Sequence, residues 1–319
     1  MRTIMITGVA GFIGNRIAEI LLKEAKRVIG LDTYQRNQKD KLRDWRMQRL
    51  DNYPDFCYFP VDIQNKDALK SVFQQNNIDA IIHMAARTGV RNSLLYPERY
   101  CNANIIGFLN VLELCRIHRI PKVVLASTSS LYAGEKGPFT EDLPVNKPLS
   151  IYTASKKAAE TLAYTYHFLY QLDVSILRYF TVYGPAGRPD MAVFKFIKGI
   201  MEGSQIEIFG DGSQQRDFTF VDDIARGTVL ALKPIGYDIV NLGNNHPHRI
   251  IDLIQLIEKF TGQKANCAFN GFNQADMKIT WANIQKAQTL LGWQPEVDLE
   301  EGIKRTVAWT KSQWSWIRG

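Results

Sequence analysis

The sequence predicts an α/β fold, a doubly wound parallel sheet followed by a smaller C-terminal lobe. Two observations predict it. Short β-branched apolar runs alternate with longer helical segments through the first half of the chain, and Gly and Pro cluster in loops beyond residue 180. Alternation of strands and helices implies a parallel sheet covered on both faces. The apolar run 123–126 fits a strand that is buried on both faces.

The elements follow one another in a regular order in the first lobe. The expected strands are Thr3–Thr7, Val28–Asp32, Cys57–Pro60, Ala80–Met84, Lys122–Ser127 and Val174–Arg178, and the expected helices cover 12–24, 66–76, 99–118 and 152–170. A basic, Trp-containing stretch over 35–51 is expected to form a helix inserted after the second strand.

The lobe boundary is expected near residue 180. The regular alternation of strands and helices ends there, and Gly- and Pro-rich loops follow at 183–189 and 209–212. Residues 1–180 are therefore assigned to a dinucleotide-binding domain and residues 181–319 mainly to a substrate-binding lobe. The segment 220–260 holds another strand-like run, Tyr237–Leu242, and is expected to return to the first domain.

Composition excludes several classes of protein. The chain of 319 residues is 45% hydrophobic and 22% charged, as folded globular proteins are. Its net charge of +7 suits anionic substrates, and the absence of a dense basic run interleaved with aromatics argues against nucleic-acid binding.

Location and metal content are also expected from the sequence. The 4 cysteines show no C-x-x-C spacing, which is typical of reduced thiols in the cytoplasm. With no apolar leader or spanning segment, no membrane association is expected. His246 and His248 lack partners at ligand spacing, so no metal is expected.

A glycine-rich turn follows the first expected strand. Gly8, Gly11 and Gly14 lie where a strand passes into a helix, and this arrangement lets the backbone approach a diphosphate at the helix N-terminus. Glycine also serves ordinary tight turns, and the spacing departs from the commoner G-x-G-x-x-G. Asp32 at the end of the second strand suits a ribose 2′-hydroxyl, which favours NAD over NADP, although Arg36 nearby weakens that exclusion. These features predict a Rossmann-type domain.

Tyr152 and Lys156 are placed for acid–base chemistry. Their spacing puts both side chains on one face of the helix expected over 152–170. A nearby ammonium lowers the pKa of a phenol from about 10, so that a tyrosinate can accept a hydroxyl proton near neutral pH. The same spacing occurs by chance on solvated helices. Its combination with the preceding strands and the glycine turn is more specific than the spacing alone.

Together these features resemble the extended short-chain dehydrogenase/reductase family over nearly the whole chain. The resemblance is carried by Tyr152 and Lys156, the glycine turn from Thr7 to Gly14, and the run 126–132. Within that family the chain is most similar to UDP-glucuronate 4-epimerases, through the runs 178–185, 187–191, 216–219, 222–223 and 291–295.

The resemblance assigns roles by position in these motifs. The catalytic residues it implies are Thr128, Tyr152 and Lys156. The NAD-binding residues it implies are Gly8, Gly11, Phe12, Ile13, Gly14, Asp32, Asp62, Ile63, Met84, Ala85, Ala86, Asn104, Tyr152, Lys156 and Tyr179. The substrate-binding residues it implies are Arg91, Ser129, Ser130, Thr181, Arg188, Phe209, Arg216 and Asp276. Among these, Phe209 would pack on uracil, and Arg216 and Asp276 would hold the rest of the UDP.

The reaction depends on the residues after Thr128. Similar dehydratases carry an Asp-Glu pair there, and sugar-acid decarboxylases carry Glu at the second position. This chain has Ser129 and Ser130. The resemblance therefore implies oxidation and re-reduction at C4 of a UDP-sugar, with NAD regenerated in each turnover.

Two departures favour a sugar acid as substrate. UDP-glucose 4-epimerases usually carry Asn at the position of Thr181 and Arg at the position of Asn273. The expected reaction is thus UDP-glucuronate to UDP-galacturonate, with Ser129, Ser130 and Thr181 near the carboxylate.

Other functions stay open at this point. The alternative is a UDP-glucose or other neutral UDP-sugar 4-epimerase, then a UDP-glucuronate decarboxylase or a non-catalytic NAD-binding sensor. The intact Tyr–Lys pair argues against a sensor. Extra apolar positions on the helices at 99–118 and 152–170, which pair into a bundle in relatives, predict a homodimer.

Overall fold

The computed structural model describes residues 1–35, 40–271 and 277–318, and it contains two compact units. The first unit comprises Met1–Ala133, Pro144–Tyr179 and Ala225–Val240, and the second comprises Gly134–Leu143, Phe180–Ile224 and Asn241–Gly319. These units are defined by contacts alone. The assignment of 1–180 to NAD and of 181–319 to the nucleotide sugar remains a prediction.

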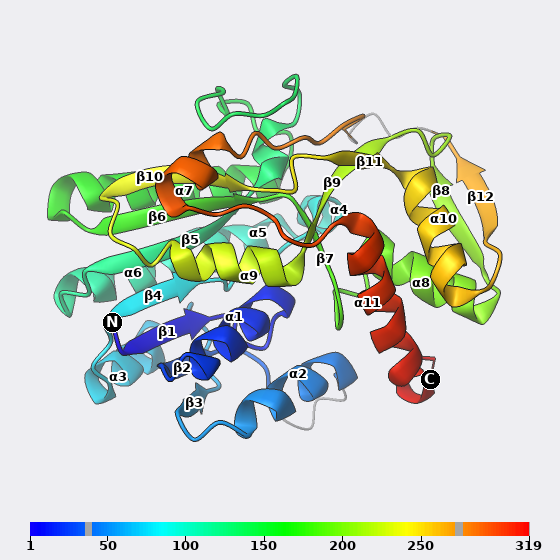
Figure 1. Cartoon of the computed structure of the whole chain (residues 1–319). Coiled ribbons are helices and arrows are strands. Elements are labelled where there is room, and N and C mark those ends of the chain that lie inside the picture. The colour runs from blue at the N-terminus through cyan, green and yellow to red at the C-terminus, as the bar shows by residue number, and fades with distance from the viewer. Residues whose placement is uncertain (36–39, 272–276, 319) are drawn as a thin grey trace. The chain divides into compact units, whose positions relative to one another are not determined.

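A seven-stranded sheet forms the centre of the first unit, in the order β10-β6-β5-β4-β1-β2-β3 (Figure 1). Its strands are β1 (Thr3–Thr7), β2 (Arg27–Leu31), β3 (Phe56–Phe59), β4 (Ala80–His83), β5 (Lys122–Thr128), β6 (Asp173–Tyr179) and β10 (Tyr237–Leu242). Neighbouring strands from β3 to β6 in this order run parallel. The expected α/β fold class and every expected strand are confirmed.

Helices connect these strands. They are α1 (Phe12–Lys23), α2 (Lys41–Asp51), α3 (Lys66–Gln75), α4 (Val90–Leu95), α5 (Pro97–Cys101), α6 (Gly107–Ile117), α7 (Ile151–Tyr170) and α9 (Val221–Leu230). The helix expected over 99–118 is present as α5 and α6, which are joined without a break by an unexpected π-helical turn, Asn102–Ile106. Such a turn widens the helix locally and is common at functional sites. Here it accommodates Asn104, which is buried and bonded to the loop after β4.

The sheet changes winding direction between β1 and β4. The chain runs outward through β1, β2 and β3, then crosses back to β4, β5 and β6. Crossover connections between parallel strands are right-handed, so helices that connect strands in opposite directions lie on opposite faces of the sheet. On one of these faces, α3, α6 and α7 contribute to one hydrophobic core. Thr7 and His83 end the two central strands side by side. Ligands of such sheets bind at this switch point.

The second unit contains small sheets covered by helices. Its strands are β7 (Thr181–Tyr183), β8 (Gln205–Phe209), β9 (Gln215–Phe220), β11 (Pro247–Arg249) and β12 (Asn266–Asn270), and its helices are α8 (Ala192–Glu202), α10 (Ile250–Thr261), α11 (Leu299–Ser312) and α12 (Trp314–Ile317). The sheets are β11-β9-β7 and β12-β8. Tyr183, Phe218 and Phe220 pack against the apolar faces of α8, α10 and α11.

Two motifs from the sequence meet inside the second unit. Trp293 is fully buried, and its indole N–H donates to the carbonyl of Asp223 at 2.9 Å. The Asp223 carboxylate accepts the N–H groups of Glu296 and Val297, each at 3.0 Å. These residues hold the C-terminal segment onto the start of α9, which is a structural role.

In the described part of the chain, no helix has both the length and the apolar character needed to cross a membrane.

Candidate active site

The glycine turn between β1 and α1 has no room for side chains. Gly8 has a φ of +76°, and a Cβ on it would lie 2.7 Å from the backbone nitrogen of Ala85. A Cβ on Gly11 would lie 2.9 Å from the carbonyl oxygen of Gly8. Gly11 is the N-cap of α1 and supplies no side-chain cap, so the first N–H groups of the helix are available to an anion. This cradle fits the diphosphate of a dinucleotide.

Asp32 directly follows β2 and braces the turn. Its carboxylate accepts the N–H of Ala10 and that of Tyr34, each at 3.1 Å. The guanidinium of Arg43 lies 3.8 Å from the same carboxylate. Arg36, which the sequence suggested as the neighbouring cation, lies outside the described residues. Arg43 from α2 is a cation beside Asp32 in the described part of the chain.

Asn104 organises the loop after β4, which contains Met84, Ala85 and Ala86. Its amide oxygen accepts the N–H of Arg87 at 2.7 Å, and its amide nitrogen donates to the carbonyl of Arg87 at 3.0 Å. The same nitrogen donates to the Ser155 hydroxyl on α7 at 2.8 Å. Asn104 therefore ties the expected cofactor loop to the helix that carries Tyr152.

Asp62 and Ile63 come after β3, at the carboxyl edge of the sheet. Asp62 is half-buried and accepts the N–H of Gln64 at 2.9 Å. Ile63 is buried in the core formed with α3 and α6, and its carbonyl accepts from Asn110 at 3.0 Å.

A capping box fixes the start of α7, where Tyr152 lies. The Ser150 hydroxyl accepts the N–H of Thr153 at 3.1 Å, and the Thr153 hydroxyl accepts the N–H of Ser150 at 3.0 Å. This reciprocal pair satisfies N–H groups at the helix start and holds its first turn. Tyr152 is half-buried, with its ring edge-on to Tyr100 at 6.4 Å between centroids. Lys156, one turn further, is buried.

A buried ion pair lies one more turn along the same face. Glu160 receives two bonds from Arg178, at 3.0 and 2.8 Å, and one from the Ser127 hydroxyl at 2.6 Å. Arg178 also donates to the Tyr132 hydroxyl at 2.8 Å. Burial lowers the pKa of Lys156 to about 8, and the charge of Glu160 acts against this lowering. The ammonium is thus poised near neutral pH.

His83 completes the polar surroundings of Lys156. Burial, and secondarily the charge of Lys156, lower the pKa of His83 to about 3, so its ring is neutral. The Nδ1 atom of His83 lies 2.9 Å from the hydroxyl of Thr7, which also accepts the N–H of Ala85 at 3.1 Å. This chain of bonds joins the ends of β1 and β4.

Hydroxyl groups cluster where β5 ends. Thr128 is the last residue of β5, and its hydroxyl accepts the N–H of Ser130 at 3.1 Å. Ser129 and Ser130 open a 3₁₀ turn, the former buried and the latter half-buried. Tyr179 is paired with Thr128 in register, and its hydroxyl lies 2.8 Å from that of Thr228.

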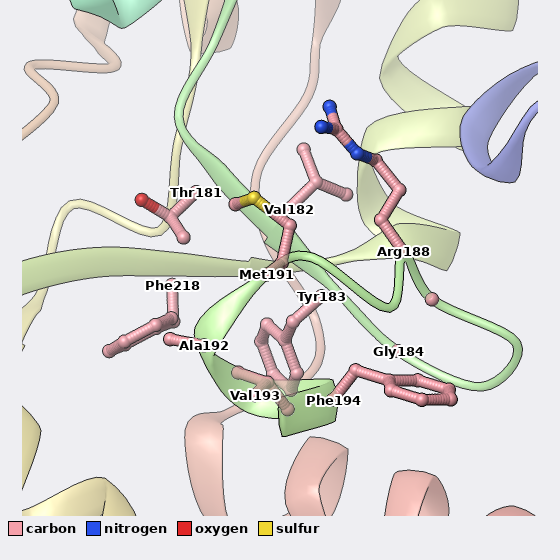
Figure 2. A pocket seen from close by; sticks show the side chains of 11 residues that line it. Thr181, Val182, Tyr183, Gly184, Arg188, Met191, Ala192, Val193, Phe194 and Phe218 are labelled. Atoms are coloured by element: carbon pink, nitrogen blue, oxygen red, sulfur yellow. The ribbon is translucent and has the colours of Figure 1, made fainter. Parts of the chain in front are cut away.

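A pocket of the second unit is lined by Thr181, Arg188 and Met191 among others (Figure 2). It has about 320 Å³ of empty space, including space open to solvent. Arg188 donates from two nitrogens to the carboxylate of Asp190, so its guanidinium is held in a fork.

Other residues assigned to the substrate lie elsewhere. Phe209 ends β8 and Arg216 lies in β9, both half-buried and outside the lining of that pocket. Arg91 is exposed on α4 of the first unit. Asp276 and Asn273 lie outside the described residues.

Several residues of the site were missed from the sequence. Glu160 continues the four-residue spacing of Tyr152 and Lys156, a signal that was available. His83 and Arg43 carry no comparable pattern, because their roles depend on which strands and helices become neighbours. Among the described residues no cluster of His, Cys, Asp or Glu could hold a metal ion.

Comparisons with known proteins agree with this geometry. The model of the NAD dependent epimerase/dehydratase family matches residues 4–243. A UDP-glucuronate 4-epimerase from Thermodesulfobacterium geofontis is 54% identical over 308 residues, which cover 96% of this chain and 95% of that protein.

Solved structures are similar over the same length. The UDP-glucuronic acid 4-epimerase of Bacillus cereus, in complex with UDP-glucuronic acid and NAD, has a TM-score of 0.91 at 38% identity, covering 98% of this chain and 99% of that one. The UDP-glucose 4-epimerase of Thermotoga maritima, with UDP-glucose, has a TM-score of 0.89 at 27% identity, with coverage of 98% and 99%.

Proposed function

The chain belongs to the NAD dependent epimerase/dehydratase family, and we propose from this premise that it is an NAD-dependent UDP-glucuronate 4-epimerase. The observation that carries the proposal is Tyr152 with the buried Lys156 on α7, beside a strand end that offers hydroxyl groups and no carboxylate. The 54% identical relative bears the same activity in its name. Inversion at C4 would interconvert UDP-glucuronate and UDP-galacturonate.

Tyr152 is the proposed base. The ammonium of Lys156 favours the tyrosinate, which accepts the proton of the C4 hydroxyl, and Thr128 offers a second hydroxyl toward the same sugar position. NAD bound at this site would supply hydride transfer from C4 and back to it. The glycine turn, Asp32 and the loop that Asn104 holds are the proposed contacts for NAD. Tyrosine 152 returns its proton after the 4-keto sugar has presented its other face.

The carboxylate of the sugar acid is assigned to hydroxyl groups. Ser129 and Ser130 stand where similar dehydratases and decarboxylases carry acids, so no general acid or base is present at these two positions to promote elimination. Thr181 stands where UDP-glucose 4-epimerases usually carry Asn. A hydroxyl rotates to suit its partner and can hold a carboxylate in two ring orientations. Arg188 is paired with Asp190 and lines the same pocket as Thr181, and it is assigned to the pocket rim or to the diphosphate.

A homodimer is the proposed assembly, and the cytoplasm is the proposed location. Large apolar side chains are exposed along α7, at the end of the π-helical turn and at the end of α6. They are Ile106, Ile117, Tyr164, Phe168, Leu169 and Tyr170. The 4 cysteines are free thiols, which suits a reducing compartment.

The test is to incubate the purified protein separately with UDP-glucuronate and UDP-glucose, with no cofactor added, and to identify products by chromatography. We expect UDP-galacturonate from the first and little product from the second. Preferred turnover of UDP-glucose would instead establish the neutral-sugar alternative, and a UDP-pentose product would establish a decarboxylase.

The matched control is Tyr152→Phe, which removes the hydroxyl and keeps the ring. General-base catalysis contributes about 10²–10⁴-fold, so turnover should fall by this factor while substrate binding persists. Near-native turnover of the Phe variant would disprove the assignment of Tyr152.

A further inference from the structure

The basic insert that the sequence left unexplained forms α2, and its arginines reach back toward the cofactor site. Arg43, Arg46 and Arg49 are spaced three residues apart, which places them on neighbouring positions of the helix surface. Each contacts a different part of the segment from Ala10 to Asp32. The helix is therefore attached to the first unit partly through charged side chains.

Arg46 is the central one of the three. It is only 6% exposed, and its guanidinium donates to the carbonyl of Ala10 at 3.2 Å. Asp32 accepts the N–H of the same residue at 3.1 Å. Both backbone polar groups of Ala10, in the middle of the glycine turn, are thus held by side chains from outside the turn.

The first turn of α1 is bonded to the same arginine. The side-chain amide of Asn15 donates to the backbone carbonyl of Arg46 at 3.0 Å. The guanidinium lies 5.9 Å from the centre of the Phe12 ring, a cation–π distance. Arg46 therefore links the turn, the helix N-terminus and α2.

Such bracing matters because the turn is rich in glycine. Glycine loses more conformational freedom on ordering than other residues do. If NAD had to order the turn on binding, that entropy would be subtracted from its affinity. Side chains that hold the turn beforehand remove this cost. An enzyme that regenerates NAD in each turnover gains from never releasing it.

We propose that α2 is a cofactor-retention clamp, in which Arg46 holds the Ala10 carbonyl and keeps the glycine turn in its NAD-binding conformation. Arg46 acts here as a positioning residue. The proposal rests on the NAD dependence of the family and on no assumption about which sugar is the substrate.

Arg49 provides a matched control on the same helix. Its guanidinium pairs with Glu19 in the middle of α1 at 2.6 Å and lies 4.8 Å from the ring of Trp45. It anchors α2 as Arg46 does, but it does so away from the glycine turn.

The experiment measures NAD binding by apoprotein stripped of cofactor, without any sugar nucleotide. We compare the dissociation constant and release rate of NAD for wild type, Arg46→Gln and Arg49→Gln, alongside the melting temperature of each apoprotein. Arg46→Gln should weaken binding by about ten- to hundredfold, the effect of one lost bond from a charged donor. Arg49→Gln should change NAD affinity by less than about threefold, whatever its effect on melting.

Two results would overturn the proposal. One is NAD affinity of Arg46→Gln within about twofold of wild type, and the other is equal weakening by Arg46→Gln and Arg49→Gln. If Arg46→Gln does not fold, Arg46→Lys replaces it, since the ammonium keeps the charge but not the planar fork. Arg46→Lys should weaken NAD binding by several-fold more than Arg49→Lys does, and equal affinities of these two would equally reject the clamp.

Discussion

In our proposal, the hydroxyl groups of Ser130 and Thr181 determine whether the 4-keto sugar acid is reduced again or loses carbon dioxide. The 4-keto form of a glucuronate is a β-keto acid. It can lose carbon dioxide when its carboxylate is not restrained by the protein. Ser130 is half-buried at the end of β5, and Thr181 is half-buried at the start of β7. Each offers one donor to a carboxylate, and a bond to a charged group contributes about 1.5–3 kcal/mol.

Ser130→Ala and Thr181→Ala should therefore shift selectivity. We expect each to lower the preference for UDP-glucuronate over UDP-glucose by about tenfold or more, and to raise the share of UDP-pentose among the products. Chromatography of product mixtures measures both. Turnover of UDP-glucose is the internal control, because a damaged catalytic site would reduce it as well. Unchanged selectivity and no added decarboxylation in both variants would remove these hydroxyls from the carboxylate site.

Other residues of the motifs that carry the family resemblance have purely structural roles. Asp217 lies next to Arg216 but is fully buried, and its carboxylate accepts the backbone N–H groups of Asn244, Asn245 and Ala282. Asp223 and Trp293 likewise bind backbone groups of their own unit. Sequence alone cannot distinguish residues that bind backbone groups of their own unit from residues that bind a ligand, because both kinds are polar and occur in similar motifs.

At the scale of the element, α7 carries three polar residues of the proposed active site in a row on one face. Tyr152, Lys156 and Glu160 follow one another at successive turns, and the charge of Glu160 raises the pKa of Lys156 against the lowering caused by burial. The charged and titratable groups around it are His83 from β4, Arg178 from β6 and Lys157 on α7. His83 is neutral, so Glu160 is what keeps the ammonium of Lys156 charged near neutral pH.

Glu160→Gln should move the pH dependence of turnover. Removal of the carboxylate leaves the effect of burial unopposed, so the pKa of Lys156 should fall further. The ammonium exists only below that pKa, so the alkaline limb of a kcat-against-pH profile should shift toward lower pH. Breaking a buried ion pair also destabilises a fold by about 3–5 kcal/mol, which thermal unfolding should detect.

The double variant Glu160→Gln with Arg178→Met separates the two effects. It removes the stranded guanidinium, so stability should largely recover, while the shift of the alkaline limb should persist. A profile that returns to wild type together with stability would mean that Glu160 acts through packing alone.

Elements were the scale at which sequence predicted most. The strands of the parallel sheet, the glycine turn and α7 follow from local periodicity and from the alternation of strands with helices. The π-helical turn at Asn102–Ile106 was not predictable, because this helix carries apolar positions on more than one face, and these hide the change of phase that one extra residue causes. The contacts of Arg43 and Arg46 depend on the packing of α2 against α1, which no local pattern encodes.

At the scale of the whole molecule, the exposed face of α7 argues for a second copy of the chain. Phe168 is 66% exposed and stacks with Tyr164 on the same helix, at 6.5 Å between ring centroids. Soluble proteins rarely expose contiguous apolar surface of this kind without a partner. A two-fold dimer covers such a face with its own copy, since the same patch then serves both subunits.

Phe168→Glu should therefore convert a dimer into a monomer. A carboxylate at this position would meet its symmetry-related copy, or apolar side chains, in a desolvated interface, and burying an unpaired charge is costly. Sedimentation or light scattering after gel filtration gives the mass of each species. The matched control is Phe269→Glu, because Phe269 is 56% exposed in β12, outside the proposed interface. Since both positions are exposed in a single chain, both variants should fold, and their melting should be compared at matched concentration. A monomeric wild type, a dimeric Phe168→Glu, or equal dissociation by Phe269→Glu would each place the subunit contact elsewhere.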